Sequence, residues 1–438
     1  MPWYHKPQLK FDITIIGAGI LGTSLAYFLS HTTKKKILVL EQAPEVAYHT
    51  SKRNTGKVHA PFLYDPQKKK LFAKAAALGF DMWEIYAKQK GLPFKKDGVL
   101  EISLDEQGTK RLEKYLSWGE QNGLKKEEMK FLDGKDVSKL EPEVRCHNAI
   151  LCTKDASVDY GKFTNSLMED AKQAGSSFLL DTRAEKIEEN KDLVQIKTSS
   201  SDTIETKFVI NAAGGMSIDI AHEMGVAHDL TDIHFRGEYW QAEEIYNNLT
   251  KVSVYSVPKH PEYPFLDPHW IVRYDGRCEV GPNAVPVFSP YGYNFTENIK
   301  EFPSKIVEML SSGAAKMLFD SQFLSLASGE FLSSVSKTVM INRVREFLPK
   351  IDPSKFHTRG TAGVRASVID SKGSFVPDAI IKEGKNSIHI LNYNSPGATG
   401  ALPFAVHVIG ELEKSERVKI SQTRCGPWQY DKILEHIR

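Results

Sequence analysis

The segment Gly17-Ala18-Gly19-Ile20-Leu21-Gly22 has the Gly-x-Gly-x-x-Gly spacing of a loop that binds the pyrophosphate of a dinucleotide. Gly17 permits a tight turn, Gly19 lets backbone amides approach the phosphates, and Gly22 lets the next helix pack closely on the preceding strand. The helix N-terminus adds partial positive charge. Glu41 stands where an acid accepts hydrogen bonds from ribose hydroxyls, which disfavours a 2′-phosphate. The loop therefore predicts a dinucleotide site, with NADP as the least favoured occupant.

The elements around this loop predict one βαβ unit. Residues 11–19 form an apolar run typical of a buried strand, 20–31 have helical apolar spacing, and 35–42 form a second buried strand. The pattern resumes over 160–215 with an amphipathic helix, a strand, and a hairpin that feeds another buried strand. The nucleotide-binding fold is therefore expected to be interrupted by other structure.

Between 216 and 335 the aromatic and proline content rises, and segments such as FRGEYWQA and WIVRYDGRCEVGP favour antiparallel strands. We therefore expect an α/β protein with an inserted antiparallel β-rich domain. Its nucleotide-binding domain would comprise 1–95, 145–215 and 336–438, and its substrate-binding or cap domain 96–144 and 216–335.

Two glycine-containing segments bear on whether the dinucleotide is NAD or FAD. FVINAAGG, which includes Ala213 and Gly214, is a buried strand whose small residues would pass close to the first glycine loop. NYNSPGATGALP, which includes Gly397, Ala398 and Thr399, enters a final helix whose N-terminus would stabilise negative charge on a reduced flavin. Alone, each is an ordinary strand or helix start. Together with the glycine loop their order resembles the Rossmann-like FAD-binding fold of glutathione reductase and D-amino-acid oxidase, which favours FAD.

Composition limits the class of partner. Of the 438 residues, 57 are Lys or Arg and 55 are Asp or Glu, so the charges nearly cancel. A balanced charge argues against nucleic acid and against a dedicated membrane-surface protein, and favours a small molecule. The four cysteines have neither a CxxC pair nor metal-ligand spacing, so we expect no disulfide and no metal site.

The distribution of apolar residues bears on location. No run of eighteen apolar residues occurs, and the first ten residues lack the apolar core of a signal peptide, which predicts a cytoplasmic protein without a transmembrane segment. The segment 428–438 is mildly amphipathic, so peripheral contact with the inner face of a membrane stays open.

Five parts of the chain together resemble the L-2-hydroxyglutarate dehydrogenase and oxidase family, within the D-amino-acid-oxidase-like flavoproteins. They are the glycine loop, SKRNTGKVHAP (51–61), HFRGEYW (234–240), residues 255–285, and the pair GVRASVID and NSPGATGALP (363–370 and 394–403). The resemblance implies FAD-dependent oxidation of an L-2-hydroxy dicarboxylate, such as L-2-hydroxyglutarate, to the 2-keto acid by hydride transfer to flavin N5. A quinone or another acceptor would then receive the electrons.

The same resemblance implies site residues near the flavin. Ser51, Asn54 and Thr55 would lie beside the cofactor in the 51–61 loop. His59 and His269 are the two candidates for the base that removes the hydroxyl proton, because histidine titrates near the working pH. The choice between them stays open, as does covalent attachment of the flavin.

Substrate binding requires cations and hydrogen-bond donors. Arg365 in GVRAS resembles the family's Gly-x-Arg, whose guanidinium would hold a carboxylate in a bidentate contact. Arg236 and Lys57 are further cationic candidates, and Tyr239 and Tyr255 are candidate hydrogen-bond donors.

The chain departs from the family pattern on two walls of the expected pocket. Thr55 replaces a smaller residue, Lys57 an apolar one, and Pro61 the final glycine. Asp267 and Trp270 replace small residues beside the family histidine. We therefore expect Lys57 to distinguish the substrate of this chain.

Other functions remain in view. Within the superfamily they are a malate:quinone-type oxidoreductase and an oxidase of glycerol 3-phosphate or an amino acid. Outside it they are a flavin-binding protein without turnover and a flavoprotein of tRNA modification. The balanced charge argues against RNA, and the presence of Arg365 with both histidines argues against loss of catalysis. Electron acceptor and oligomeric state stay open.

Overall fold

The computed structural model describes residues 9–260, 263 and 267–438. The expectation about a signal peptide therefore falls mostly outside the described residues, and so do five positions, 261–262 and 264–266, of the family-like segment 255–285.

A parallel sheet forms the nucleotide-binding half. Its central strand β1 (Leu9–Ile16) pairs with β2 (Ile37–Leu40) on one side and β12 (Thr203–Asn211) on the other. Parallel pairing continues outward to β9 (Ser177–Leu179) and β22 (Ser387–Leu391). The interior strands are almost wholly apolar because both faces of such a sheet are covered. This confirms the predicted βαβ unit and the α/β class.

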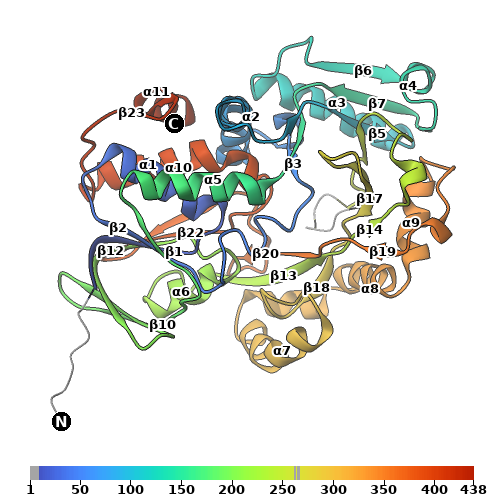
Figure 1. Cartoon of the computed structure of the whole chain (residues 1–438). Coiled ribbons are helices and arrows are strands. Elements are labelled where there is room, and N and C mark those ends of the chain that lie inside the picture. The colour runs from blue at the N-terminus through green and yellow to red at the C-terminus, as the bar shows by residue number, and fades with distance from the viewer. Residues whose placement is uncertain (1–8, 261–262, 264–266) are drawn as a thin grey trace.

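Helices cover one face of this sheet. α1 (Ile20–Thr32) lies beside α5 (Tyr160–Gln173) and α10 (Gly397–Lys414), as Figure 1 shows. α2 (Lys70–Lys90) and α11 (Tyr430–Ile437) pack against α10. The buried residues of α11 face its own domain, so the amphipathic tail has a partner within the chain. No helix in the described part of the chain is long and apolar enough to cross a membrane.

The other face carries the predicted hairpin. β10 (Ala184–Glu189) and β11 (Val194–Thr198) are antiparallel, and β11 pairs with the first half of β12. β21 (Ile380–Glu383) is antiparallel to β22. The short helix α6 (Ser217–Glu223) follows β12 after a turn at Gly214–Met216.

A second, largely antiparallel sheet of eight strands forms the other half. In spatial order its strands are β19 (Thr358–Arg359), β14 (Trp240–Gln241), β17 (Cys278–Gly281), β16 (His269–Val272), β15 (Ser253–Ser256), β5 (Val99–Ser103), β7 (Asn148–Cys152) and β6 (Met129–Asp133). β15 and β5 are parallel to each other. The predicted β-rich domain is confirmed as a feature of the fold.

The second sheet extends beyond the residue ranges expected for it. β7 pairs with β5 and β6, so the sheet continues past residue 144 to Cys152. The cause is the apolar face of β7, whose Ala149 and Ile150 are buried in the core of this half rather than against the first sheet. β19 likewise belongs to the second sheet although it lies after residue 336.

Two small sheets lie between the halves. In the first, β13 (Thr231–Gly237) pairs with β18 (Val285–Val287) and with β20 (Gly363–Ile369). In the second, β8 (Ala156–Val158) pairs with β3 (Lys57–Val58) and β4 (Phe94–Lys95). The remaining helices include α3 (Glu106–Gln121), α4 (Gly134–Leu140), α7 (Phe295–Leu310), α8 (Ser321–Val335) and α9 (Lys337–Arg345). β13 and β20 run from one half to the other (Figure 1), and β20 carries Arg365.

Candidate active site

A continuous cavity of about 1420 Å³ runs between the two halves. It exceeds the roughly 300–1,000 Å³ of an ordinary ligand pocket, as expected for a dinucleotide together with a small acid. Most of the predicted site residues line it: Gly17, Gly19, Glu41, Ser51, Asn54, Thr55, Lys57, His59, Ala213, Gly214, Tyr239, Tyr255, His269, Arg365, Gly397, Ala398 and Thr399. The structure thus brings together residues from four separate parts of the sequence.

The glycine loop has the close contacts that its spacing predicts. Gly17 has φ of +105°, and a Cβ there would lie 2.6 Å from the carbonyl oxygen of Ala212. Gly22 does not line the cavity, but a Cβ at this position would lie 1.9 Å from the carbonyl oxygen of Gly17. Its role is therefore close packing of α1 on the loop. The Glu41 carboxylate accepts hydrogen bonds from the backbone N–H groups of Ala18 (2.7 Å) and Ala43 (2.9 Å).

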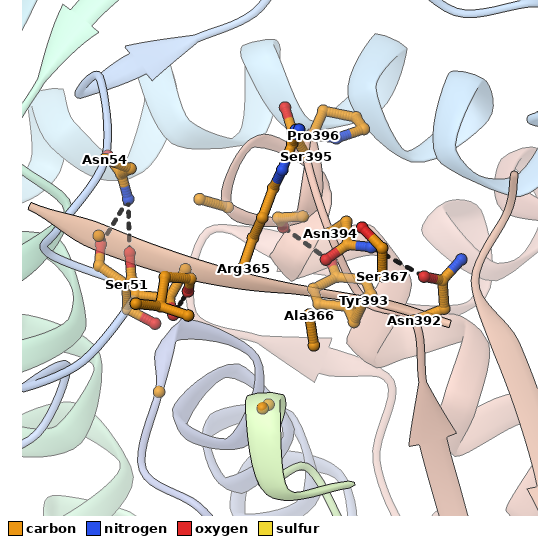
Figure 2. Close-up of a pocket in the computed structure, with 18 of the residues that line it drawn as sticks. Ser51, Asn54, Arg365, Ala366, Ser367, Asn392, Tyr393, Asn394, Ser395 and Pro396 are labelled. Atoms are coloured by element: carbon orange, nitrogen blue, oxygen red, sulfur yellow. Dashed lines mark hydrogen bonds between the residues drawn. The ribbon is translucent and has the colours of Figure 1, made fainter. Parts of the chain in front are cut away.

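Ser51 and Asn54 shape the segment that passes along the cavity. The Ser51 hydroxyl accepts a hydrogen bond of 2.9 Å from the backbone N–H of Ile20, at the start of α1. The Asn54 amide donates to the carbonyls of Thr50 and Ser51, as Figure 2 shows for Ser51, and accepts from the N–H of Gly56. These bonds fix the turn, so the asparagine acts on the shape of the loop.

The N-terminus of α10 faces the same cavity. Gly397, Ala398 and Thr399 line it, and the first turn of this helix carries no acidic residue to compensate its partial positive charge. The Thr399 hydroxyl accepts a hydrogen bond of 3.0 Å from the backbone N–H of His59. The predicted flavin-side loop and the predicted flavin-side helix are therefore joined directly.

The two candidate bases both lie close to one tyrosine, Tyr255. The ring centroid of Tyr255 is 6.1 Å from that of His59 and 4.2 Å from that of His269. Among the described residues, neither the Tyr255 hydroxyl nor His269 Nδ1 has a hydrogen-bond partner, although both atoms are buried. Burial lowers the pKa of His269 to about 3, so its imidazole is neutral.

His59 has a different environment. Its Nδ1 lies 3.8 Å from Oδ2 of Asp155, a fully buried carboxylate. Asp155 also accepts a hydrogen bond of 3.2 Å from the backbone N–H of Ala60. An acid at this position can orient an imidazole ring.

Arg365 presents an uncompensated cation to the cavity. It lies on β20 opposite Phe235, and its guanidinium carbon is 5.8 Å from the centroid of that ring. Its Nη2 is buried without a hydrogen-bond partner, and no ion pair with a described carboxylate satisfies it. Burial lowers the pKa of Arg365 to about 10, which leaves it charged at neutral pH. Figure 2 shows the side chain extending from β20 toward Ser395 and Pro396.

Two cationic candidates are engaged elsewhere. Arg236 lies outside the cavity, because its guanidinium pairs with Glu238 at 3.1 Å and donates to the carbonyl of Gly292. Lys57 donates to the Ser157 hydroxyl at 2.6 Å and lies 3.3 Å from Asp97, with no exposed surface on its side chain. Lys57, although it lines the cavity, is therefore held in a buried ion pair, and Arg236 is paired with Glu238 outside the cavity.

Sequence reasoning missed two buried acids near the histidines. Asp155 lies in the turn between β7 and β8, where a single acid carries no recognisable pattern. Glu101 is 2% exposed at the centre of β5 and lines the cavity. An acidic residue at the middle of the apolar strand VLEIS was a signal that could have identified Glu101.

The described residues contain no group of three or more His, Cys, Asp or Glu side chains that could hold a metal ion.

Tyr239 lines the cavity, and the guanidinium of Arg273 lies 5.4 Å from its ring centroid.

Comparison with known proteins gives the family. A sequence model described as "FAD dependent oxidoreductase" matches residues 12–409. The chain belongs to the FAD-dependent oxidoreductases. This family match confirms FAD as the cofactor, and the glycine loop and the N-terminus of α10, which line the same cavity, would hold a dinucleotide.

This oxidoreductase has relatives over nearly its whole length. The protein named "L-2-hydroxyglutarate dehydrogenase, mitochondrial" from Caenorhabditis elegans is 32% identical over 413 residues, 92% of this chain and 93% of the relative. The L-2-hydroxyglutarate dehydrogenase of Indibacter alkaliphilus is 31% identical over 398 residues, 90% and 96% of the two chains. The predicted family resemblance is therefore confirmed.

Solved structures support the fold. The FAD-bound, dithionite-reduced L-alpha-glycerophosphate oxidase of Mycoplasma pneumoniae superposes with a TM-score of 0.74, covering 96% of this chain and 98% of its own. At 20% identity this similarity concerns the fold alone.

Proposed function

We propose that this oxidoreductase oxidises the CH–OH group of an L-2-hydroxy acid to the 2-keto acid, and that its substrate is a dicarboxylate such as L-2-hydroxyglutarate. The observation that carries the proposal is the uncompensated guanidinium of Arg365, which faces the cavity that also contains both histidines. Burial of a cation without a partner costs free energy. A substrate carboxylate would supply the missing ion-pair partner of the Arg365 guanidinium. The names of the relatives point to the same substrate.

Arg365 would bind the carboxylate next to the reacting carbon. Its planar fork can hold both oxygens, which fixes the orientation of the hydroxyl group and of the α-hydrogen. When bound, FAD supplies the acceptor for the hydride that leaves the α-carbon.

His59 is the base that the surroundings favour. An Nδ1–H turned toward Asp155, 3.8 Å away, would leave Nε2 to accept the hydroxyl proton, with the carboxylate facing the imidazolium that forms. His269 is a weak base because burial holds its pKa at about 3. Its neutral imidazole suits a hydrogen bond to the substrate instead.

The proposal is tested with a substrate panel under anaerobic conditions, with loss of the flavin's visible absorbance as the readout. The panel contains L- and D-2-hydroxyglutarate, L-malate, glycerol 3-phosphate and an L-amino acid. We expect the fastest bleaching with L-2-hydroxyglutarate and little with its D enantiomer. Bleaching by glycerol 3-phosphate or the amino acid alone would reject an L-2-hydroxy acid as the substrate.

A further inference from the structure

A carboxyl group, a phenol and an imidazole lie in one row across three neighbouring strands. Glu101 of β5 is the direct partner of Tyr255 on the parallel strand β15. In the antiparallel pairing of β15 with β16, Val254 lies opposite Trp270, which puts Tyr255 opposite His269. Direct cross-strand partners point to the same face of a sheet. The row therefore presents Glu101, Tyr255 and His269 to the cavity that all three line.

Glu101 is an exception in its surroundings. It is 2% exposed, and its neighbours on this face of the sheet are apolar, including Val99, Ile150 and Ile271. The structure gives it no ion pair with a described Lys or Arg, and the mechanism above does not use it. An isolated charged carboxylate is costly in such surroundings, whereas a neutral carboxyl needs only a hydrogen-bond partner.

The groups around Glu101 favour its neutral form. The ionisable side chains close enough to interact with it are Asp155, before β8, Tyr64, at the end of the 3-10 helix Pro61–Leu63, Tyr115 of α3, and Tyr255. Burial, with a further contribution from the Asp155 carboxylate, holds the pKa of Glu101 well above its usual range. Buried among apolar side chains and without a described cation, Glu101 favours the neutral form, in which its carboxyl O–H can donate a hydrogen bond.

We propose that Glu101 is a specificity-determining residue that donates a hydrogen bond from its neutral carboxyl to the distal carboxylate of the substrate. This inference rests on the proposed function. The row extends roughly 10 Å, two strand spacings, from β16 to β5. A substrate anchored near His269 would extend along it with its distal group toward Glu101. The Tyr255 hydroxyl, which has no described partner, supplies a second donor.

Charge favours an anion over a cation at this end of the cavity. Arg111 and Lys114 belong to α3, a helix that packs against β5, and both line the cavity, whereas the nearby Asp155 carboxylate does not line it. A cationic distal group would instead require Glu101 to ionise. The Glu101→Gln variant separates an anionic from a cationic distal group, because its amide can still donate a hydrogen bond to an anion but cannot carry the negative charge that a cation would need.

The experiment compares Glu101→Gln and Glu101→Leu with the unmodified FAD-loaded protein. The two substrates are L-2-hydroxyglutarate and L-2-hydroxypentanoate, in which a methyl group replaces the distal carboxylate. Glu113→Leu, an exposed position on α3 outside the cavity, is the matched control. Flavin absorbance and thermal unfolding establish that each variant is folded and loaded.

We expect Glu101→Leu to lower kcat/KM for the dicarboxylate by about 10–100-fold, the effect of losing a hydrogen bond to a charged group. Its kcat/KM for the monocarboxylate should stay within about threefold, and Glu101→Gln should keep the dicarboxylate value within about tenfold. Equal losses on the two acids with Glu101→Leu, or a loss with Glu101→Gln as large as with Glu101→Leu, would overturn the assignment. If the unmodified protein oxidises neither acid, the proposed function itself fails and this inference fails with it.

Discussion

His59 Nδ1 lies 3.8 Å from the Asp155 carboxylate, and the backbone N–H of Ala60 donates to the same Asp155 oxygen. Ala60, the residue after His59, therefore holds the Asp155 carboxylate beside the imidazole ring. Neither Nδ1 makes a hydrogen bond, but among the described residues no carboxylate lies as close to His269 as Asp155 lies to His59. This proximity is the structural basis for treating His59 as the base.

Replacement of the acid should slow the reaction without weakening substrate binding. Asp155→Asn keeps the shape of the side chain but removes the charge that stabilises the imidazolium. We expect kcat to fall by about 10–100-fold, less than on removal of the base itself, with KM changed little. Steady-state kinetics measure both constants, and Asp192→Asn, at an exposed position, is the control. An unchanged kcat would remove Asp155 from the mechanism.

The two histidines should differ when each is replaced by asparagine. His59→Asn removes the proposed proton acceptor, so we expect kcat to fall by about 10²–10⁴-fold. His269→Asn retains a hydrogen-bonding side chain and should cost less than about tenfold. Pre-steady-state flavin reduction with L-2-hydroxyglutarate gives both rates. The opposite order would assign the base to His269.

Loss of the Arg365 guanidinium should abolish efficient turnover while the protein stays yellow and folded. Truncation of one partner of a buried charge contact costs about 2–5 kcal/mol, so Arg365→Ala should lower kcat/KM by about 30- to 4,000-fold. Arg365→Lys should recover part of the lost kcat/KM, because lysine keeps the positive charge but cannot make the bidentate contact of a guanidinium. Flavin content and circular dichroism establish the integrity of both variants. An unchanged kcat/KM in Arg365→Ala would exclude Arg365 from substrate binding.

The Lys57–Asp97 pair should affect stability more than catalysis. Burial lowers the pKa of Lys57, and the Asp97 carboxylate opposes that shift. Asp97→Asn leaves the ammonium without its ion-pair partner and should lower the free energy of unfolding by about 3–5 kcal/mol. The double variant Lys57→Met, Asp97→Leu should regain most of this stability, because it removes both charges of the ion pair together.

Urea unfolding measures these differences, and kcat/KM for L-2-hydroxyglutarate is measured on the same preparations. The double variant should keep kcat/KM within about tenfold of the unmodified protein, since the Lys57 side chain has no exposed surface. A folded, flavin-loaded double variant without activity would return Lys57 to the substrate site.

The parts of the fold that could be predicted from sequence are those with local signals. The glycine loop, the adjoining buried strands and the β11–β12 hairpin each have a periodicity or a turn residue that identifies them. The sequence places β7 in the first domain, because its apolar side chains could be buried in the core of either half. Its membership of the second sheet depends on pairing with β5, about fifty residues earlier.

The side-chain roles that could not be predicted depend on distant partners. Lys57 contacts Asp97 and Ser157, 40 and 100 residues away in the sequence, and no local pattern links them. Glu101 and Asp155 are single acids whose significance comes from burial beside Tyr255 and His59. Arg365, in contrast, lies in a family-like segment, and the structure leaves its charge free for a ligand.

Oxidation of an L-2-hydroxy acid at its carbinol carbon can be followed in a single anaerobic turnover. The flavin-loaded protein is mixed with one equivalent of L-2-hydroxyglutarate, and flavin absorbance is followed while the acid products are quantified by mass spectrometry. We expect loss of the oxidised-flavin spectrum with formation of one 2-oxoglutarate per flavin reduced, and neither change with the D enantiomer. A flavin that stays oxidised with the L enantiomer, or bleaches without formation of the 2-keto acid, would contradict the proposed oxidation.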